Sequence, residues 1–298
     1  MPLRTEKSGQ NALRSQVRKI AILLLPSLRY LFTTEVHAYA FSIAANVYLS
    51  FFPFALILLS VCRRWLHWEG AYETILELLR VHLPAGTDSV VTNLIALVQG
   101  RPRLQAMSVF MLFFTASGVF LPLEVSLNKI WGIARNRSFL RNLFVSFALA
   151  IVAGVLALFW ISMATIAQAL LTFTLDWIPS PGLLRVISRG LLETISIPFA
   201  VSIFFVIYFC LPNGRVPVER VLPAAVITGL LMTVARFLYV LTLPLFRFRE
   251  VYGPFALSVT LLFWAFVGAL IMLFGAHLSV QGFWDDSWIL RAVRARMR

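Results

Sequence analysis

The sequence predicts an all-α membrane protein, built as a bundle of six transmembrane helices, and three observations support this class. Six stretches carry almost no charge: residues 36–62, 104–123, 142–175, 194–214, 221–235 and 251–284. A helix of roughly 20 apolar residues is long enough to cross the hydrocarbon core of a bilayer. Hydrophobic residues make up 60% of the 298 residues and charged residues only 13%. Because the backbone in lipid must satisfy its own hydrogen bonds, such stretches should be helices.

A basic arm, residues 1–35, comes before the first apolar stretch. Residues 11–29 place apolar side chains at helical intervals beside Arg14, Arg18 and Lys19. A basic amphipathic helix next to a span commonly lies at the membrane interface, attracted by anionic lipid. The alternative is a solvated arm with fortuitous apolar residues. We expect the interfacial helix, with membrane lipids as its partners.

The first predicted span, 36–62, contains a proline and an amide side chain. Pro53 cannot donate to the helix ladder, so we expect a kink whose freed carbonyl groups could line a cavity. Asn46 lies mid-span, where an amide joins helices as often as it binds a ligand. Pro198 and Pro223 predict further kinks in the fourth and fifth spans.

Residues 69–103, between the first two spans, are too polar to cross the membrane and too regular to be a loop. A helical pattern over 72–83 is broken by Pro84 and Gly86, and a second pattern runs to Gly100. Helices commonly end at such residues. We expect an amphipathic hairpin on the outer face, which either covers the mouth of the bundle or rests on the membrane surface.

The second span, 104–123, ends in a polar group. Glu124, Asn128 and Trp131 are spaced i, i+4 and i+7, so they share one helix face. A carboxylate at this position could pair with Arg236 or receive a transported cation. The alternative is an interfacial residue among lipid headgroups.

The remaining spans hold two further polar candidates. The third, 142–175, is longer than one crossing, which predicts a strong tilt or an interfacial extension. The fifth reaches full length only by continuing through Arg236 to residue 246. Charge at that depth costs several kcal/mol, so Arg236 serves function, fixes helix packing or snorkels to an interface. We expect it to face the interior, near Asn46, Glu124 or a carbonyl close to Pro53. In the sixth span, His277 is a candidate proton relay.

The net charge of +13 reflects topology rather than a nucleic-acid partner. If the N-terminus is cytoplasmic, sixteen of the 26 Lys and Arg residues lie on the cytoplasmic side and nine outside. This bias follows the positive-inside rule. We expect one membrane domain, 36–284, between the basic arm and a basic cytoplasmic tail, 285–298, and no nucleic-acid partner.

Catalytic signatures of hydrolases, zinc enzymes and nucleotide-binding proteins do not occur in the sequence. The thirteen acidic residues do not gather like the carboxylates of a two-metal nuclease. We therefore assign no catalytic residue, metal ligand or cofactor, and expect that the chain is not an enzyme.

Several short motifs follow one another along the chain. They are Ala44 to Pro53, Glu124 with Asn128 to Gly132, Arg135 to Arg141, Tyr208 to Pro212 with Asn213 and Pro217, Leu222 to Ala225, Val251 with Tyr252 and Gly253, and Gly275 to Leu278. Together, over residues 30–282, they resemble the YihY/BrkB membrane family. The resemblance implies six spanning helices in the bacterial inner membrane with both termini in the cytoplasm.

Two positions depart from the pattern expected of that family. His277 replaces an acid, and Thr233 stands where many relatives carry an acid before the basic position. Both departures weaken a proton-coupling mechanism built on carboxylates. The resemblance implies a transporter-like or envelope-biogenesis role with a lipid or other amphiphile as substrate. The alternative is a non-transporting scaffold. The third interpretation, the family's older ribonuclease BN label for a tRNA-processing enzyme, has no support in the residues.

Overall fold

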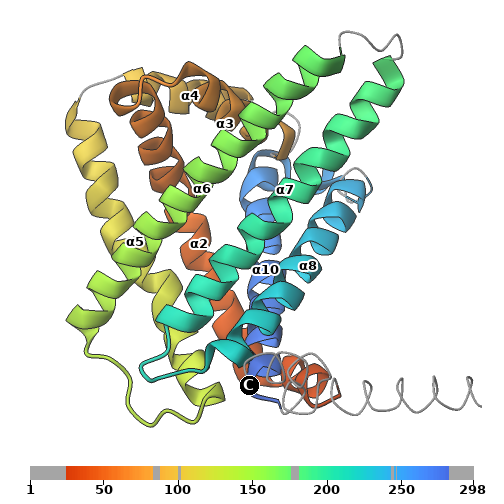
Figure 1. The fold of residues 1–298 in the computed structure, drawn as a ribbon. Coiled ribbons are helices and arrows are strands. Elements are labelled where there is room, and N and C mark those ends of the chain that lie inside the picture. Colours follow the sequence, from red (N-terminus) through yellow and green to blue (C-terminus); the bar gives the residue numbers. More distant parts are fainter. Residues whose placement is uncertain are drawn as a thin grey trace, which may run out of the picture.

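The computed structural model describes residues 25–82, 88–99, 102–175, 181–242, 245 and 247–281. Every regular element within them is a helix, which confirms the predicted all-α class (Figure 1). Five of these helices are long and apolar enough to cross a membrane, and Ser196–Cys210 forms a shorter apolar helix. The chain is a polytopic membrane protein. Most of the predicted basic arm and the whole tail lie outside the described residues.

Six long helices build the bundle. They are α2 (Thr34–Ser60), α5 (Pro102–Ile130), α6 (Phe139–Leu175), α7 (Pro181–Cys210), α8 (Val218–Thr242) and α10 (Ala256–Val280). The helix α2 packs against α5 and α10, α7 packs against α8, and α6 contacts both α5 and α7. Each predicted span therefore corresponds to one of these helices, in the predicted order.

The predicted hairpin is present as α3 (Glu69–His82) and α4 (Asp88–Gln99). Its apolar residues join those at the end of α2 in one buried cluster, which includes Leu59, Cys62, Tyr72, Leu76 and Leu94. Because the hairpin packs on the bundle in this way, it covers the bundle's end, as one of the two alternatives predicted. We call this the hairpin end.

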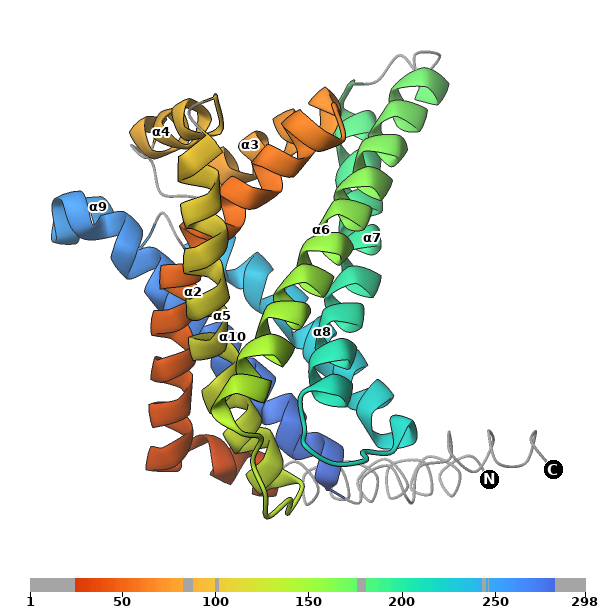
Figure 2. The ribbon, with the colours of Figure 1, turned by 90° about the vertical axis from the view of Figure 1, so that its left-hand side faces the viewer.

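The opposite end of the bundle is called the basic end (Figure 2). It holds the start of α2, the end of α10 and two loops, 131–138 between α5 and α6 and 211–217 between α7 and α8. Residues 25–31, just before α2, are helical. Both loops carry arginines, among them Arg135, Arg137 and Arg215.

Three helices differ from their predicted extents. The helix α6 is one continuous helix of 37 residues, about 56 Å long at 1.5 Å per residue, and it runs obliquely through the bundle (Figure 1). This geometry agrees with the tilt predicted for the third span.

The helix α7 begins at Pro181 rather than at residue 194. The sixth predicted span is not continuous from residue 251: α9 (Phe248–Tyr252) and a 3-10 turn, η2 (Gly253–Phe255), precede α10. Gly253 has φ +51, a conformation that glycine tolerates, and Pro254 after it cannot donate to a helix.

The prolines predicted to kink the spans lie inside continuous helices, Pro53 in α2, Pro198 in α7 and Pro223 in α8. In Figure 2 the second half of α2 leans away from the direction of the first half. The helix then passes into one π-helical turn, η1 (Val61–Trp65).

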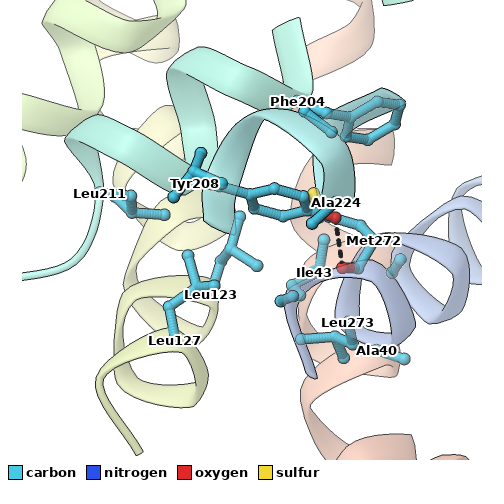
Figure 3. Packing of buried hydrophobic residues seen from close by; sticks show 14 of the residues in the cluster. Ala40, Ile43, Leu123, Leu127, Phe204, Tyr208, Leu211, Ala224, Met272 and Leu273 are labelled. Atoms are coloured by element: carbon cyan, nitrogen blue, oxygen red, sulfur yellow. Dashed lines mark hydrogen bonds between the residues drawn. The ribbon is translucent and has the colours of Figure 1, made fainter. Parts of the chain in front are cut away.

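Packing is tight at the crossing of α7, α8 and α10. Tyr208 of α7 is fully buried, and its hydroxyl donates to the carbonyl oxygen of Met272 at 2.6 Å (Figure 3). The same hydroxyl lies 3.1 Å from Thr228 Oγ1. A Cβ atom at Gly275 would overlap Thr228 Oγ1. Small residues let helix backbones approach closely in membranes, and this crossing fixes α8 and α10 relative to α7.

Candidate functional site

Glu124 lies in a buried polar network at the basic end. Its side chain is 1% exposed. Atom Oε1 accepts a hydrogen bond from the Arg137 backbone N–H at 3.0 Å and another from Asn128 Nδ2 at 3.3 Å. Arg137 Nη1 lies 3.9 Å from the same oxygen. Because α5 continues as a helix to Ile130, Glu124 and Asn128 share one face, as their spacing predicted.

Arg137 connects this carboxylate to the end of α7. Its guanidinium donates to the carbonyl oxygens of Cys210, Leu211 and Pro212, at 3.1, 2.5 and 3.1 Å. The last carbonyl groups of a helix lack partners within the helix, and the helix dipole favours a cation there. Arg137 therefore neutralises Glu124 and caps α7 at the same time.

Asn128 and Asn213 extend the network to both loops of the basic end. The Asn213 backbone N–H donates to Asn128 Oδ1 at 2.8 Å, and Asn128 Nδ2 donates to Asn136 Oδ1 at 2.9 Å. The Asn213 side chain donates to the carbonyl oxygen of Arg135 at 2.9 Å. The network thus joins motif residues that are far apart in the sequence. It also corrects one expectation, because Glu124 pairs with Arg137 and not with Arg236.

Arg236 lines a separate cavity of about 370 Å³ beneath α3. Five helices besides α8 contribute to its wall, which is almost entirely apolar and aromatic. The lining residues are Phe51 and Leu58 of α2, Ile75 and Leu79 of α3, Ala157, Trp160 and Ile161 of α6, Phe199 of α7, Arg236 and Tyr239 of α8, and Leu261 and Trp264 of α10.

The guanidinium of Arg236 faces protein. Its Nη2 donates to Ser196 Oγ of α7 at 3.4 Å. Two ring pairs flank the cavity: Trp160 stacks on Phe199 with 5.4 Å between centroids, and Tyr239 lies 4.7 Å from Trp264. The site therefore combines one permanent cation with an aromatic wall. The interior position expected for Arg236 agrees with this geometry, but its hydrogen-bond partner Ser196 was not foreseen.

Asn46 and Pro53 lie outside both of these sites. Asn46 Nδ2 donates to the carbonyl oxygen of Ser42 at 2.8 Å. A Cβ atom at Gly118 would overlap the Asn46 side chain, so Asn46 packs at the crossing of α2 and α5. Pro53 lines an apolar cavity of about 390 Å³ near α4. Tyr252 and Gly253 are exposed at the break before α10.

His277 connects the end of α10 to the residues before α2. Its Nδ1 lies 2.9 Å from Ser27 Oγ and 3.4 Å from Gln281 Nε2. The ring stacks on Tyr30 with 4.4 Å between centroids, and burial raises the pKa of Tyr30 to about 12. In the described part of the chain these partners of His277 are all uncharged at neutral pH.

Several residues of these sites were not identified from the sequence. Arg137 was counted as a topological charge and as part of the motif 135–141, but it was not identified as the partner of Glu124, although a single short loop separates the two residues. Ser196 and the aromatic wall gave no signal, because Trp160, Tyr239 and Trp264 look like ordinary lipid-facing residues in an apolar run. Only the folded arrangement places them around Arg236.

The chain has clear relatives. Residues 29–283 match the family model described as virulence factor BrkB. The chain belongs to the BrkB family. This membership confirms the resemblance drawn from the short motifs. Among the described residues, no three His, Cys, Asp or Glu side chains gather as metal ligands would.

Three similar proteins carry the name UPF0761 membrane protein. One from Aliivibrio salmonicida is 25% identical over 84% of this chain and 79% of its own length. One from Pseudomonas aeruginosa is 27% identical over 80% of this chain and 57% of its own length. One from Chlorobium limicola is 22% identical over 89% of this chain and 58% of its own length. The chain thus spans little more than half of the last two proteins. No solved structure matches it.

Proposed function

We propose that this BrkB-family protein binds a lipid or other amphiphile in the Arg236 cavity and transfers it within or across the bacterial inner membrane. Both termini are cytoplasmic in this proposal, so the hairpin end faces outward. The observation that carries the proposal is the composition of the cavity, one guanidinium in an aromatic and aliphatic wall.

The cavity suits a molecule with one polar and one apolar part. Its volume of about 370 Å³ falls within the range of about 300–1,000 Å³ common for small-ligand sites. It has room for a headgroup or a segment of an acyl chain. The guanidinium of Arg236 can donate several hydrogen bonds to phosphate or carboxylate oxygens. The rings of Trp160 and Trp264 offer an apolar surface to the apolar part of the bound molecule.

The two ends of the bundle suggest a route. The helix α3 supplies Ile75 and Leu79 to the cavity wall, so a displacement of α3 would open the cavity at the hairpin end. At the basic end, Arg137 holds the loops 131–138 and 211–217 together. We therefore expect the substrate to enter or leave beneath α3 while the network keeps the basic end closed.

The test is transfer of labelled phospholipid and of lipopolysaccharide precursors in vesicles that contain the purified protein. Arg236→Gln should reduce the rate at least tenfold, because it removes the charge and keeps only a shorter, uncharged polar side chain. Ala157→Phe should also reduce it by filling the cavity. The matched control is Val155→Phe on the same helix, which adds the same ring at a position 60% exposed on the bundle surface.

The competing function is a scaffold that packs with other membrane proteins and transfers nothing. A scaffold predicts no transfer in any vesicle. It also predicts that Arg236→Gln changes only the folding of the protein and not a transfer rate. Equal rates for the wild type, Arg236→Gln and Ala157→Phe would favour the scaffold. The proposal includes no enzymatic step, and a ribonuclease role has no catalytic residues assigned to it.

A further inference from the structure

A polar pocket of about 390 Å³ lies at the basic end and shares no lining residue with the Arg236 cavity. It is formed by Tyr30, Lys129, Ile130, His277, Val280 and Gln281, and we call it the interfacial pocket. Three parts of the chain meet there, the segment before α2, the end of α5 and the end of α10. Neither the proposed function nor the Glu124 network uses it.

We infer the tautomer of His277 from its hydrogen bonds. The amide nitrogen of Gln281 can only donate, and it lies 3.4 Å from His277 Nδ1. Ser27 Oγ, 2.9 Å from the same atom, can donate as well. With Nδ1 as the acceptor, the neutral ring carries its proton on Nε2. The ring therefore has an N–H donor on the side opposite to Ser27, with no acceptor on it among the described residues.

Lys129 supplies a positive charge to the same pocket. Its ammonium pairs with Glu35, and the two side chains are 60% and 63% exposed. Ion pairs between exposed side chains contribute little to stability, because water and salt screen them. A stronger anion can therefore take the place of Glu35 on Lys129 at little cost.

The pocket lies at the ends of two membrane-spanning helices, where lipid headgroups are expected. The helix α5 ends at Ile130 and α10 ends at Val280, so the pocket opens where two spans leave the apolar layer. Ile130 and Val280 give it an apolar side, and Lys129 and His277 give it donors. A cation would be repelled by Lys129, whereas an anion with several acceptor oxygens fits both donors.

We propose that the interfacial pocket binds the phosphate group of a membrane phospholipid, between Lys129 Nζ and the His277 Nε2–H. The glycerol and first methylene groups then lie against Ile130 and Val280. Because Tyr30 and His277 are stacked, a bound lipid would also hold the segment before α2 against α10. This site is independent of transfer through the Arg236 cavity, so either proposal can fail without the other.

Native mass spectrometry of the full-length protein, released from detergent with phosphatidylglycerol, measures lipid retention and apparent affinity. Lys129→Gln should weaken binding about tenfold, the effect of losing one charge-assisted hydrogen bond worth about 1.4 kcal/mol. His277→Phe should weaken it too, because phenylalanine keeps the stack on Tyr30 but lacks the N–H. Glu35→Gln should tighten binding, since it removes the carboxylate that competes for Lys129. The control is Arg215→Gln, an exposed charge in the loop 211–217, with less than a twofold effect.

A second experiment, with soluble phosphate, distinguishes the two sources of a phosphate group, a lipid headgroup and free inorganic phosphate. Equilibrium dialysis with inorganic phosphate should show no binding that depends on Lys129. If Lys129→Gln abolishes binding of inorganic phosphate while lipid retention is unchanged, the lipid assignment is overturned. If Lys129→Gln and Arg215→Gln weaken lipid binding equally, the lipid responds only to overall charge and the site is rejected. Should His277→Phe fail to fold, the opposite effects of Lys129→Gln and Glu35→Gln still decide the question.

Discussion

At the scale of single residues, the chain stabilises its basic end with a buried ion pair. Glu124 and Arg137 are 1% and 9% exposed, and 3.9 Å separates Oε1 from Nη1. Burying two charges is costly, and part of the cost is offset by the hydrogen bonds that Glu124 Oε1 accepts and that the Nη atoms of Arg137 donate. Each member therefore depends on the other, and removal of one leaves an uncompensated buried charge.

The pair gives a direct prediction for Arg137→Ala. Breaking a buried pair by removing one partner costs about 3–5 kcal/mol, so unfolding of the purified protein in detergent should occur at clearly lower denaturant concentration. Arg135→Ala is the control, because Arg135 has an exposed side chain and joins the network only through its carbonyl group. A loss below about 1 kcal/mol for Arg137→Ala would contradict the structural role of the pair.

The sequence predicted part of this site for a physical reason. Glu124 and Asn128 are one helical turn apart, so their shared face follows from helix geometry alone. The partner of Glu124 depends on the path of the loop 131–138, which no periodicity describes. The number of residues that precede Arg236 in the fifth span predicted its depth in the membrane. The other residues that line its cavity come from five other helices, so sequence spacing could not predict them.

At the scale of helices, the crossing of α7, α8 and α10 depends on the absence of a side chain. A Cβ atom at Gly275 would lie 2.7 Å from the Tyr208 hydroxyl and would overlap Thr228. Both neighbours are fully buried, and Tyr208 is held by its bond to Met272 (Figure 3). They have no free space into which to move.

Gly275→Ala should therefore destabilise the bundle. Overpacking a filled core costs about 1–3 kcal/mol, and thermal unfolding monitored by circular dichroism would measure the loss. Gly154→Ala in α6 is the matched control, because its added Cβ would meet Phe54 at 3.7 Å, an ordinary contact. If both variants unfold at the wild-type temperature, the crossing is looser than its geometry indicates.

Helix ends were predicted best where proline and glycine mark them. The hairpin was predicted between such residues and is found there as α3 and α4. The start of α7 was missed, because Arg185, Arg189 and Glu193 interrupt the apolar run although the helix continues through them. The break at Gly253 was missed for the opposite reason. The run from residue 251 carries no charge, so the prediction followed its length and passed over Gly253 and Pro254, which mark the break.

At the scale of the whole molecule, charge and packing distinguish the two ends. The basic end carries the ion pair and the arginine-bearing loops, and the hairpin end is covered by α3 and α4. From the distribution of charge along the chain and the positive-inside rule, we expect the basic end to face the cytoplasm.

Cysteine labelling in spheroplasts tests the orientation. In a variant whose Cys62 and Cys210 are replaced by serine, Glu73→Cys, at an exposed position of α3, should react with a membrane-impermeant maleimide. Arg135→Cys in the loop 131–138 should react only after the membrane is opened. The reverse pattern would place the basic end outside, and the proposed direction of entry beneath α3 would have to be abandoned.

The central claim is that an amphiphile occupies the Arg236 cavity. Photo-crosslinking tests it most directly, with a phospholipid that carries a diazirine in its acyl chain and mass spectrometry to map the adducts. The account predicts adducts on Trp160, Tyr239 and Trp264, lost in Arg236→Gln and Ala157→Phe, above a background at the surface positions Val155 and Phe159. Adducts confined to Val155, Phe159 and similar surface positions, unchanged in both variants, would contradict it.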